Sequence, residues 1–289
     1  MISTYLYKIK TKLLGKQAPR VAVVRLEGVI AAQARMGRGI SLESVEDDLE
    51  KAFNLPGLEA VALIINSPGG AVVQSARIAE RIRFLAKKKS VPVLAFGDDV
   101  MASGGYMLAL AADEIFVHEA SMVGSIGVIA SGFGFVELIK RFGVERRVHA
   151  AGENKAMLDP FLEEDPEHSA HFDSMLDEVH EQFKAYVRDR RGKRLKGLRG
   201  KIFSGEIYTG REAVKLGLVD DVREMQELLM ERFGDAVELK YITKRKTGLL
   251  AMLPFGGGEA SARIAAREAG LPALAAHMEE MSVWQRFGL

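Results

Sequence analysis

Three short motifs rich in glycine and serine lie between residues 63 and 127, and they carry the side chains best suited to chemistry. Their sequences are NSPGG at 66–70, ASGGY at 102–106 and GSIG at 124–127. Each motif falls where a predicted strand gives way to a helix or a turn. In an α/β fold such places present backbone N–H groups and small side chains at the edge of the sheet. Ser103 in the second motif is the candidate nucleophile.

A serine that attacks an acyl group needs hydrogen-bond donors for the oxyanion that forms, and backbone N–H groups can supply them. Gly104 directly follows Ser103. Gly70 ends a glycine pair after a buried strand, where glycine can adopt conformations that aim N–H groups outward. Gly70 and Gly104 are therefore the candidate oxyanion hole. On position alone Ser103 is also typical of an ordinary helix N-cap.

The base that would activate this serine is harder to find. None of the six histidines lies in a recognisable catalytic motif, and His168 and His171, three residues apart, lack a third ligand nearby for a metal site. An uncharged lysine can serve as the base, but its pKa must then fall by ~3 units from ~10.4, which costs roughly 4 kcal/mol. Lys155 has small and apolar neighbours on its C-terminal side, and Ser125 is a plausible hydroxyl partner. Most lysines are solvated surface charges, so composition alone does not select Lys155.

Short apolar runs alternate with helical patterns around these motifs. Apolar runs without polar alternation are typical of strands buried on both faces, so we expect βαβ units and a largely parallel sheet. The predicted strands are 21–27, 60–66, 91–96, 114–117, 144–150, 218–221 and 236–242, with a further short extended segment at 206–209. The predicted helices begin at the Ser41 cap and run to about 53, then cover 71–87, 103–111, 135–142, 171–188, 211–216 and 224–233.

The ends of the chain differ from its centre. Residues 2–16 place apolar side chains at helical spacing with lysines between them, which is typical of a helix that lies on an anionic membrane or docks on its own domain or a neighbouring subunit. A glycine run at 256–258 predicts a linker, and a helical tail follows, with Trp284 and Phe287 as docking anchors. The predicted divisions are 1–19, a catalytic domain at 20–245, and 246–289.

Composition excludes several functional classes. The chain has 289 residues, a formal net charge of +1 and no cysteine, so disulfides, thiolate metal sites and a cysteine nucleophile are excluded. Residues 184–201 contain nine Lys or Arg and one Asp, and we interpret them as a solvated helix end and loop; no nucleic-acid partner is expected. No apolar stretch reaches the ~18–20 residues of a membrane span, and no signal peptide is evident. A cytoplasmic or peripheral membrane protein without a cofactor is expected.

Five motifs in linked order carry a family resemblance. They are INSPGG, ASGGY, GSIGV, a GxxKxxxDPF pattern at 152–161 and YTGREAVKLGLVD at 208–220. Together they resemble the signal peptide peptidase A family of serine peptidases, over about residues 20–235. The 52 positions between Ser103 and Lys155 (155 − 103) are similar to the separation in family members that have a single such unit.

The resemblance implies an α/β fold of the Clp protease/crotonase superfamily, a spiral of ββα units, here with a helical C-terminal extension. It implies that Ser103 is the nucleophile, that Lys155 is the general base and that Ser125 orients the lysine. Gly70 and Gly104 would form the oxyanion hole, beside a peptide held as an added strand. It further implies ring or dome oligomers whose active sites are shared between protomers, and short apolar peptides, such as released signal peptides, as substrates. Many family members carry a membrane anchor that is not evident here.

Two alternatives use the same fold differently. A crotonase-type acyl-CoA enzyme also holds an oxyanion with paired N–H groups, but it usually works with a carboxylate acid/base pair and would tolerate loss of Ser103. A non-catalytic scaffold for membrane-associated partners has no reason to keep Ser103, Ser125 and Lys155 together. A peptidase is the favoured interpretation of the sequence.

Overall fold

The computed structural model describes residues 18–32, 39–196, 199–242 and 281–288, so the predicted helix at 2–16 and the glycine linker lie outside the described residues. Residues 281–285 are helical. The other elements, in chain order, are β1 (Arg20–Glu27), α2 (Leu42–Phe53), β2 (Leu58–Ser67), α3 (Val72–Lys89), β3 (Val93–Ala102), α4 (Gly104–Ala109), β4 (Glu114–Val117), β5 (Met122–Gly124), α5 (Val136–Arg141), η2 (Glu153–Ala156), α6 (Pro166–Arg191), η3 (Gly192–Arg194), α7 (Arg199–Ile202), β6 (Ile207–Thr209), α8 (Gly210–Leu216), β7 (Asp221–Val222), α9 (Met225–Phe233) and β8 (Glu238–Ile242).

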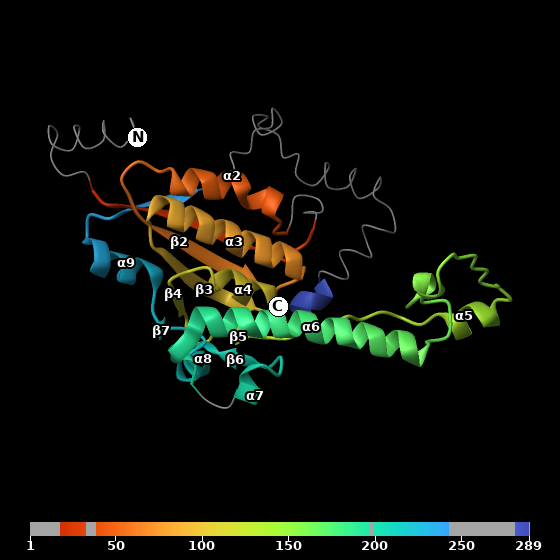
Figure 1. The fold of residues 1–289 in the computed structure, drawn as a ribbon. Helices are drawn as coiled ribbons and strands as arrows, with labels where there is room; N and C mark the ends of the chain where they lie inside the picture. Colours follow the sequence, from red (N-terminus) through yellow and green to blue (C-terminus); the bar gives the residue numbers. More distant parts are fainter. Residues whose placement is uncertain (1–17, 33–38, 197–198, 243–280, 289) are drawn as a thin grey trace, which may run out of the picture.

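Within the described residues, eight strands form one sheet at the centre of the body (Figure 1). Six of them follow the order β6-β5-β3-β2-β1-β8, while β4 pairs with β3 and β7. The pairs are parallel except for β5 with β6. Parallel neighbours require a crossover between strands, and helices such as α3 provide it. The predicted α/β class with a largely parallel sheet is therefore confirmed.

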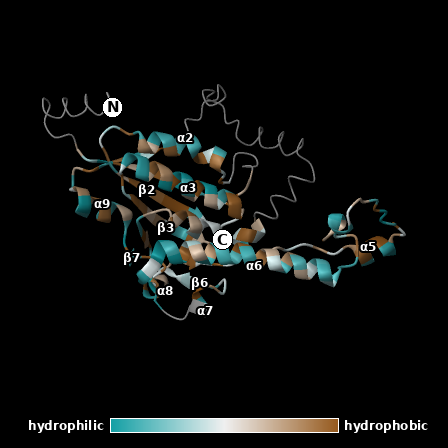
Figure 2. Ribbon diagram, viewed as in Figure 1, coloured by the Kyte–Doolittle hydropathy of each residue, from teal (hydrophilic) through white to brown (hydrophobic). Residues whose placement is uncertain are grey.

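Both faces of the central strands are buried, which explains their uninterrupted apolar sequences. Alternate residues belong to two separate apolar clusters, Val21 and Ala60 to one, Ala22 and Val61 to the other. This is the two-residue period of a strand. The larger cluster includes side chains of α2, α3 and α4, and the smaller one is covered by α9, where Leu229 is fully buried. Figure 2 shows apolar strands beneath helices whose outer faces are hydrophilic.

Strand β3 changes its pairing partner partway along. It pairs with β4 from Leu94 to Gly97 and with β5 from Val100 to Ala102. Asp98 and Asp99 lie between the two halves, where the pairing with β2 is also irregular. The predicted strand ended at residue 96, but β3 continues to residue 102 and leads directly into Ser103.

Residues 128–165 form an arm at the far end of α6, away from the sheet (Figure 1). Helix α6 has 26 residues, so it is about 39 Å long at 1.5 Å per residue. Its buried residues are Phe183, Val187 and Arg191, all in the last third. The prediction of a strand at 144–150 is wrong: within the described residues this segment pairs with no strand, and it is exposed throughout. None of the described helices combines the length and hydrophobicity needed to span a bilayer.

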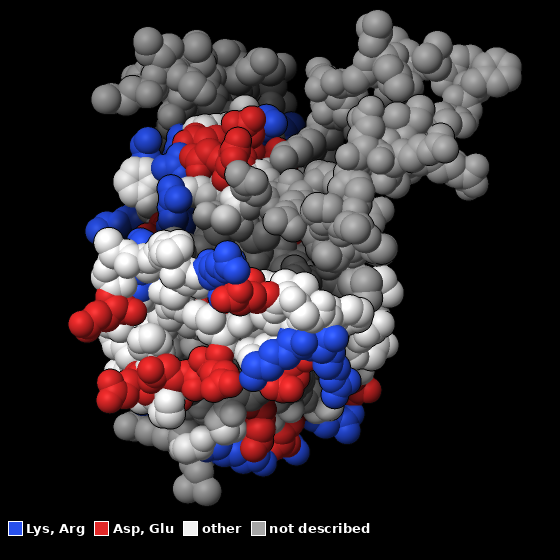
Figure 3. All heavy atoms as spheres, turned by 90° about the vertical axis from the view of Figure 1, so that its right-hand side faces the viewer, with Lys and Arg blue, Asp and Glu red and all other residues white. Residues whose placement is uncertain are grey.

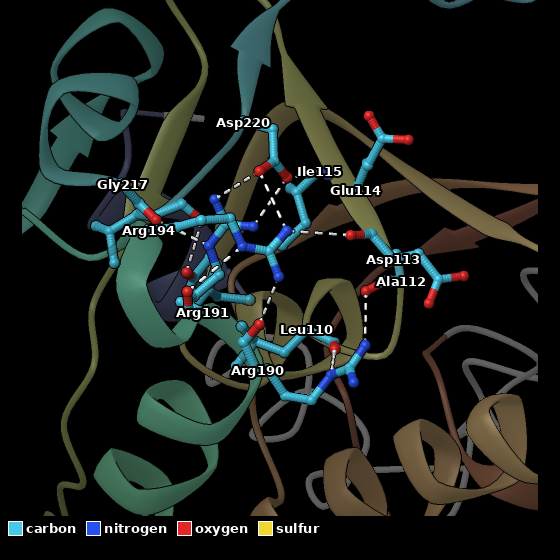
Figure 4. A network of polar contacts seen from close by, with 12 residues as sticks. Leu110, Ala112, Asp113, Glu114, Ile115, Arg190, Arg191, Arg194, Gly217 and Asp220 are labelled. Carbon is cyan, nitrogen blue, oxygen red and sulfur yellow. Dashed lines mark hydrogen bonds and ion pairs between the residues drawn. The ribbon is translucent and has the colours of Figure 1, made fainter.

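The C-terminal end of α6 is fixed to the body by a buried arginine (Figure 4). Arg191 is 2% exposed, and its guanidinium donates to both carboxylate oxygens of Asp220, at 2.8 and 3.1 Å, and to the Gly217 carbonyl. The same carboxylate accepts the Ile115 N–H of β4 at 2.7 Å. Burial raises the pKa of a carboxyl group, but the hydrogen bonds and charge of Arg191 outweigh it and hold the pKa of Asp220 below its ordinary value.

This network corrects the interpretation of the basic stretch at 184–201 as solvated. Arg190 donates to the backbone carbonyl oxygens of Leu110 and Ala112, just after α4, and Arg194 also donates to Asp220. Part of the positive charge therefore joins α6 to the body. Because Asp220 and Arg191 lie 29 positions apart in the sequence, charge counting could not pair them.

We expect Asp220→Asn to lower the free energy of unfolding by about 3–5 kcal/mol, because it leaves the buried Arg191 guanidinium without its countercharge. Urea unfolding followed by circular dichroism measures the change. Asp221→Asn is the matched control, since Asp221 is the next residue and is exposed; its effect should stay within about 0.5 kcal/mol. Equal effects of the two substitutions would contradict a stabilising role for the buried pair.

The same pair predicts a pH dependence with a defined sign. An unfolded aspartate titrates near ~3.9, and the pKa of folded Asp220 is lower. Its contribution to stability is therefore complete above pH ~4 and is lost as the pH falls through the folded-state pKa. Wild-type unfolding free energy should fall below pH ~4 more steeply than that of Asp220→Asn.

Candidate active site

Ser103 lies at a tight turn between β3 and α4. Its backbone has φ 52° and ψ −122°, a conformation that few residues other than glycine adopt. The Ser103 N–H donates to the Gly124 carbonyl of β5 at 2.8 Å, and the Met107 N–H donates to the Ser103 carbonyl at 3.0 Å. Such strained turns persist where the surrounding structure fixes them, and they are common at active sites. A serine on a strand-to-helix turn of this kind projects its hydroxyl beyond the sheet edge.

The Ser103 hydroxyl does not cap the helix that follows it. The residue holds the N-cap position of α4, yet its side chain accepts no capping hydrogen bond. By contrast, the Ser41 side chain accepts the Ser44 N–H in a capping box at the start of α2. The capping explanation of Ser103, open from the sequence, is therefore wrong, and its hydroxyl is available for another role.

The NSPGG motif lies directly against this serine. A Cβ added to Gly69, where φ is 103°, would lie 2.6 Å from the Ser103 Cβ and 2.8 Å from the Gly104 nitrogen. Only glycine allows the loop to approach so closely. Gly70 is exposed and has φ 137°. Within the described part of the chain, no hydrogen bond from the Gly70 or the Gly104 N–H is found, so both donors are free.

Two glycines let α4 pack tightly behind Ser103. A Cβ on Gly104 would collide with the hydroxyl of Ser75 in α3, and one on Gly105 would lie 2.6 Å from the carbonyl oxygen of Ser67. Ser67 is fully buried, and its hydroxyl accepts the Gly69 N–H at 3.2 Å. The two glycine-rich loops are thus fixed to each other through β2 and α3.

Ser125 lies beside Ser103 through the backbone. The residue before it, Gly124, supplies the carbonyl oxygen that Ser103 binds. Ser125 has φ 51°, is partly exposed, and donates its N–H to the Glu206 carbonyl at 2.7 Å. The structure therefore brings four of the five predicted site residues to one end of the sheet.

The fifth residue, Lys155, does not lie with them in the single chain. It is exposed in the short η2 helix of the arm, which Figure 1 places beyond the far end of α6. Its neighbour Asn154 bonds His168 of α6 at 2.9 Å. The Lys155 side chain is exposed to solvent in this chain, whereas an uncharged lysine base requires a desolvated position.

The turn that carries Lys155 is nevertheless a defined structure. Asp159 is held by two hydrogen bonds from the Arg146 guanidinium, the shorter at 2.7 Å, and these bonds keep the pKa of the Asp159 carboxyl below its usual range. The Arg146 guanidinium also lies over the Phe161 ring at 5.8 Å, and that ring contacts Phe135 at 5.5 Å. The DPF part of the fourth motif therefore holds the arm's tip together.

Two residues near the site were not predicted. His180 of α6 bonds the Ile126 carbonyl at 3.1 Å, and it must be the donor because a carbonyl only accepts. Asn66, the first residue of NSPGG, accepts the Val100 N–H with its side-chain oxygen. The motif contained Asn66, but its pairing with β3 depends on a strand irregularity that no sequence pattern marked.

The arrangement can stabilise an oxyanion beside a serine hydroxyl. It offers a nucleophile on a strained turn and two free N–H donors from separate loops, as acyl transfer requires. No group of three His, Asp or Glu side chains that could hold a metal occurs in the described ranges.

Known proteins share this sequence organisation. The model of peptidase family S49 matches residues 85–239, more than half of the chain. A Synechocystis sp. protein named "putative protease" is 32% identical over 242 residues, which cover 79% of this chain and 83% of that protein. Among solved structures, a mutant of the 1510-N membrane-bound stomatin-specific protease is similar at 17% identity with a TM-score of 0.49, covering 79% of this chain and 100% of that one.

A longer relative matches most of this chain. A Brucella abortus protein named Na(+)/H(+) antiporter NhaA is 44% identical over 275 residues, which are 93% of this chain but 37% of that protein. The chain thus spans little more than a third of that relative. The family match and the Synechocystis relative, together with the motifs around Ser103, show that the chain belongs to peptidase family S49.

Proposed function

We propose that this protein is a serine endopeptidase in which Ser103 is the nucleophile and Lys155 of a neighbouring protomer is the general base. The observation that carries the proposal is the uncapped Ser103 hydroxyl on a strained turn, beside the free N–H groups of Gly70 and Gly104. Membership of a peptidase family favours peptide hydrolysis over acyl-CoA chemistry. It also favours an enzyme over a scaffold.

A neighbouring protomer is the natural source of the base, because the arm carries Lys155 away from the body of its own chain. The arm also exposes large apolar side chains, with Phe133 80% and Phe142 76% exposed. Phe133 also contacts Phe135, which contacts Phe161, and contiguous exposed apolar surface is typical of a face that another protein covers. Figure 3, which faces the arm's side of the molecule, shows uncharged surface bordered by acidic and basic groups. Docked on the next copy, the arm would leave water and its lysine would lose solvation, as a neutral base requires.

The proposed reaction follows from these positions. The Ser103 Oγ bonds the scissile carbonyl carbon while its proton passes to the uncharged Lys155 Nζ. The carbonyl oxygen becomes an oxyanion and accepts the N–H groups of Gly70 and Gly104. Collapse of this intermediate breaks the C–N bond, and the lysine ammonium gives its proton to the leaving amine. Water then hydrolyses the acyl ester by the same route, and the Ser125 hydroxyl orients the lysine throughout.

Short hydrophobic peptides, such as released signal peptides, are the proposed substrates. A peptide would add as a strand along the NSPGG loop, where the exposed Gly70 offers its backbone. We assign residues 20–245 to the catalytic domain. We assign residues 1–19 and 246–289 to segments outside the catalytic domain. We propose that the first segment contacts a membrane or a neighbouring subunit.

Covalent labelling tests the nucleophile directly. The purified full-length protein is treated with a fluorescent fluorophosphonate, which reacts with activated serines, and the labelled peptide is identified by mass spectrometry. We expect one adduct, on Ser103, and none in the Ser103→Ala variant. Labelling at another serine, or no labelling of a protein that still cleaves fluorogenic peptides, would contradict the assignment.

A further inference from the structure

The pairing between β2 and β3 is interrupted just before the proposed active site. Ile65 pairs with Gly97, and the next regular pair is Ser67 with Met101. One residue of β2 therefore faces three residues of β3 across the interruption. This is also the point at which β3 leaves β4 and begins to pair with β5. Something must hold the two strands in register across the extra length.

The side chain of Asn66, the single β2 residue within the interruption, spans it. Its Oδ1 accepts the Val100 N–H at 3.1 Å, and its Nδ2 donates to the Asp99 carboxylate at 3.3 Å. Its backbone carbonyl accepts the Gly28 N–H at 3.0 Å, which fixes the end of β1 as well. The side-chain amide thus replaces the missing ladder hydrogen bond between β2 and β3, and with its backbone carbonyl Asn66 connects three strands at one position.

Asn66 and Val100 precede the two proposed oxyanion donors by the same number of residues in the sequence. Gly70 lies four residues after Asn66, and Gly104 lies four residues after Val100. We propose that Asn66 is a positioning residue that sets the spacing of the Gly70 and Gly104 N–H groups around the Ser103 hydroxyl. This inference rests on the proposed function. The hydrogen bond between Asn66 and Val100 fixes both segments at their starting points.

This role differs from simple stabilisation of the sheet. An oxyanion hole works only when both donors lie within hydrogen-bond distance of one oxygen, and misplacement by about 1 Å can cost about 100-fold in rate. Substrate binding along the loop depends much less on this spacing. Loss of the Asn66 amide should therefore lower kcat and leave KM nearly unchanged.

The test compares four variants with the wild-type full-length protein. Asn66→Ala removes both side-chain hydrogen bonds. Asn66→Asp keeps the acceptor for Val100 but opposes two carboxylates, and the double variant Asn66→Asp/Asp99→Asn restores the second bond with donor and acceptor exchanged. Asp98→Asn is the matched control, because Asp98 lies in the same interruption but pairs with Arg25. Each variant is assayed for peptide cleavage, for inhibition by a peptide aldehyde and its matched alcohol, and for melting temperature.

We expect Asn66→Ala to lower kcat about 10- to 100-fold, with KM changed less than about twofold. The aldehyde, whose hemiacetal places an oxyanion between the donors, should lose affinity by the same factor, while the alcohol should not. Asn66→Asp should also lose activity, the double variant should recover to within about threefold of wild type, and Asp98→Asn should match wild type.

The opposite result is equally clear. If Asn66→Ala lowers the melting temperature but keeps kcat and aldehyde affinity, Asn66 is only structural and the inference is overturned. If exchange of the pair fails to restore the activity that Asn66→Asp loses, the bridge to Asp99 is not part of the positioning. A wild-type protein that neither cleaves peptides nor reacts with a fluorophosphonate would instead remove the proposed peptidase itself.

Discussion

Replacing Ser103 by alanine is expected to lower kcat for peptide cleavage by at least about 10⁴-fold, because the nucleophile is lost and the remaining groups can only bind the substrate. Hydrolysis of short hydrophobic fluorogenic peptides measures the effect. The oxyanion donors stay in place in this variant, since the backbone of Gly104 is unchanged. KM should therefore change little, and the loss should appear in kcat.

The same substitution should barely affect stability. A serine that caps a helix contributes about 0.5–2 kcal/mol, which alanine removes. Ser103 makes no such bond, so the unfolding free energy of Ser103→Ala should lie within about 0.5 kcal/mol of wild type. Ser90 is the matched control, since it also has a positive φ, of 54°, but ends α3 at a distance from the motifs. Ser90→Ala should keep full activity.

A Ser103→Ala protein that cleaves peptides as fast as wild type would end the assignment. Chemistry that needs only paired N–H donors, such as that of acyl-CoA enzymes, would then be favoured. A large loss of both stability and activity would return Ser103 to a structural role.

The layered fold could be predicted because burial leaves a strong mark on sequence. Strands buried on both faces must be apolar throughout, and β1 and β2 were predicted within two residues of their bounds. Helix α6 was predicted to start at residue 171 but begins at Pro166, after an Asp165 cap that the sequence already contained. The strand predicted at 144–150 is wrong because an apolar pattern alone does not show that a segment is buried. Its apolar residues recur at strand-like spacing, but they lie on the exposed arm and no partner strand is there.

Contacts between distant segments could not be predicted. The Asp98-Asp99 pair interrupts an apolar run, which indicates a strand end. The strand β3 nevertheless continues beyond it, because the Asn66 side chain accepts the Val100 N–H from 34 positions away in the sequence. The Arg191 side chain was counted with a solvated basic stretch, although it is buried against Asp220. Polar residues of this kind are fixed by tertiary partners, and their local sequence resembles that of surface loops.

Some residues of the candidate site could also be predicted from the local sequence, and others could not. Ser103, Gly70 and Gly104 could be chosen because glycine and serine in these motifs have specific backbone and chemical roles. Lys155 was one lysine among many, and only the family resemblance selected it. Lys155 lies on an arm, so the proposed pairing with Ser103 forms only between protomers. Such a pairing cannot be derived from the local sequence or from one chain.

Two inactive variants should restore activity when they assemble together. If each site takes Ser103 from one protomer and Lys155 from the next, Ser103→Ala and Lys155→Ala protomers form a complete site wherever the intact serine faces the intact lysine. When equal amounts of the two variants assemble at random, about a quarter of the sites contain both an intact Ser103 and an intact Lys155. We therefore expect about a quarter of wild-type activity from assemblies in which each variant alone is at least about 10³-fold less active.

The experiment requires that both variants share one assembly. Co-expression with two different affinity tags and purification through both in turn selects mixed assemblies, and light scattering measures their mass. Lys140→Ala is the matched control for the lysine, because Lys140 is another exposed lysine of the arm, bonded to Glu137 and Glu163; it should keep wild-type activity alone. Mixed assemblies that purify through both tags but stay as inactive as their components would contradict a shared site. The lysine would then have to reach Ser103 of its own chain, by a movement of the whole arm along α6, or another base would have to replace it.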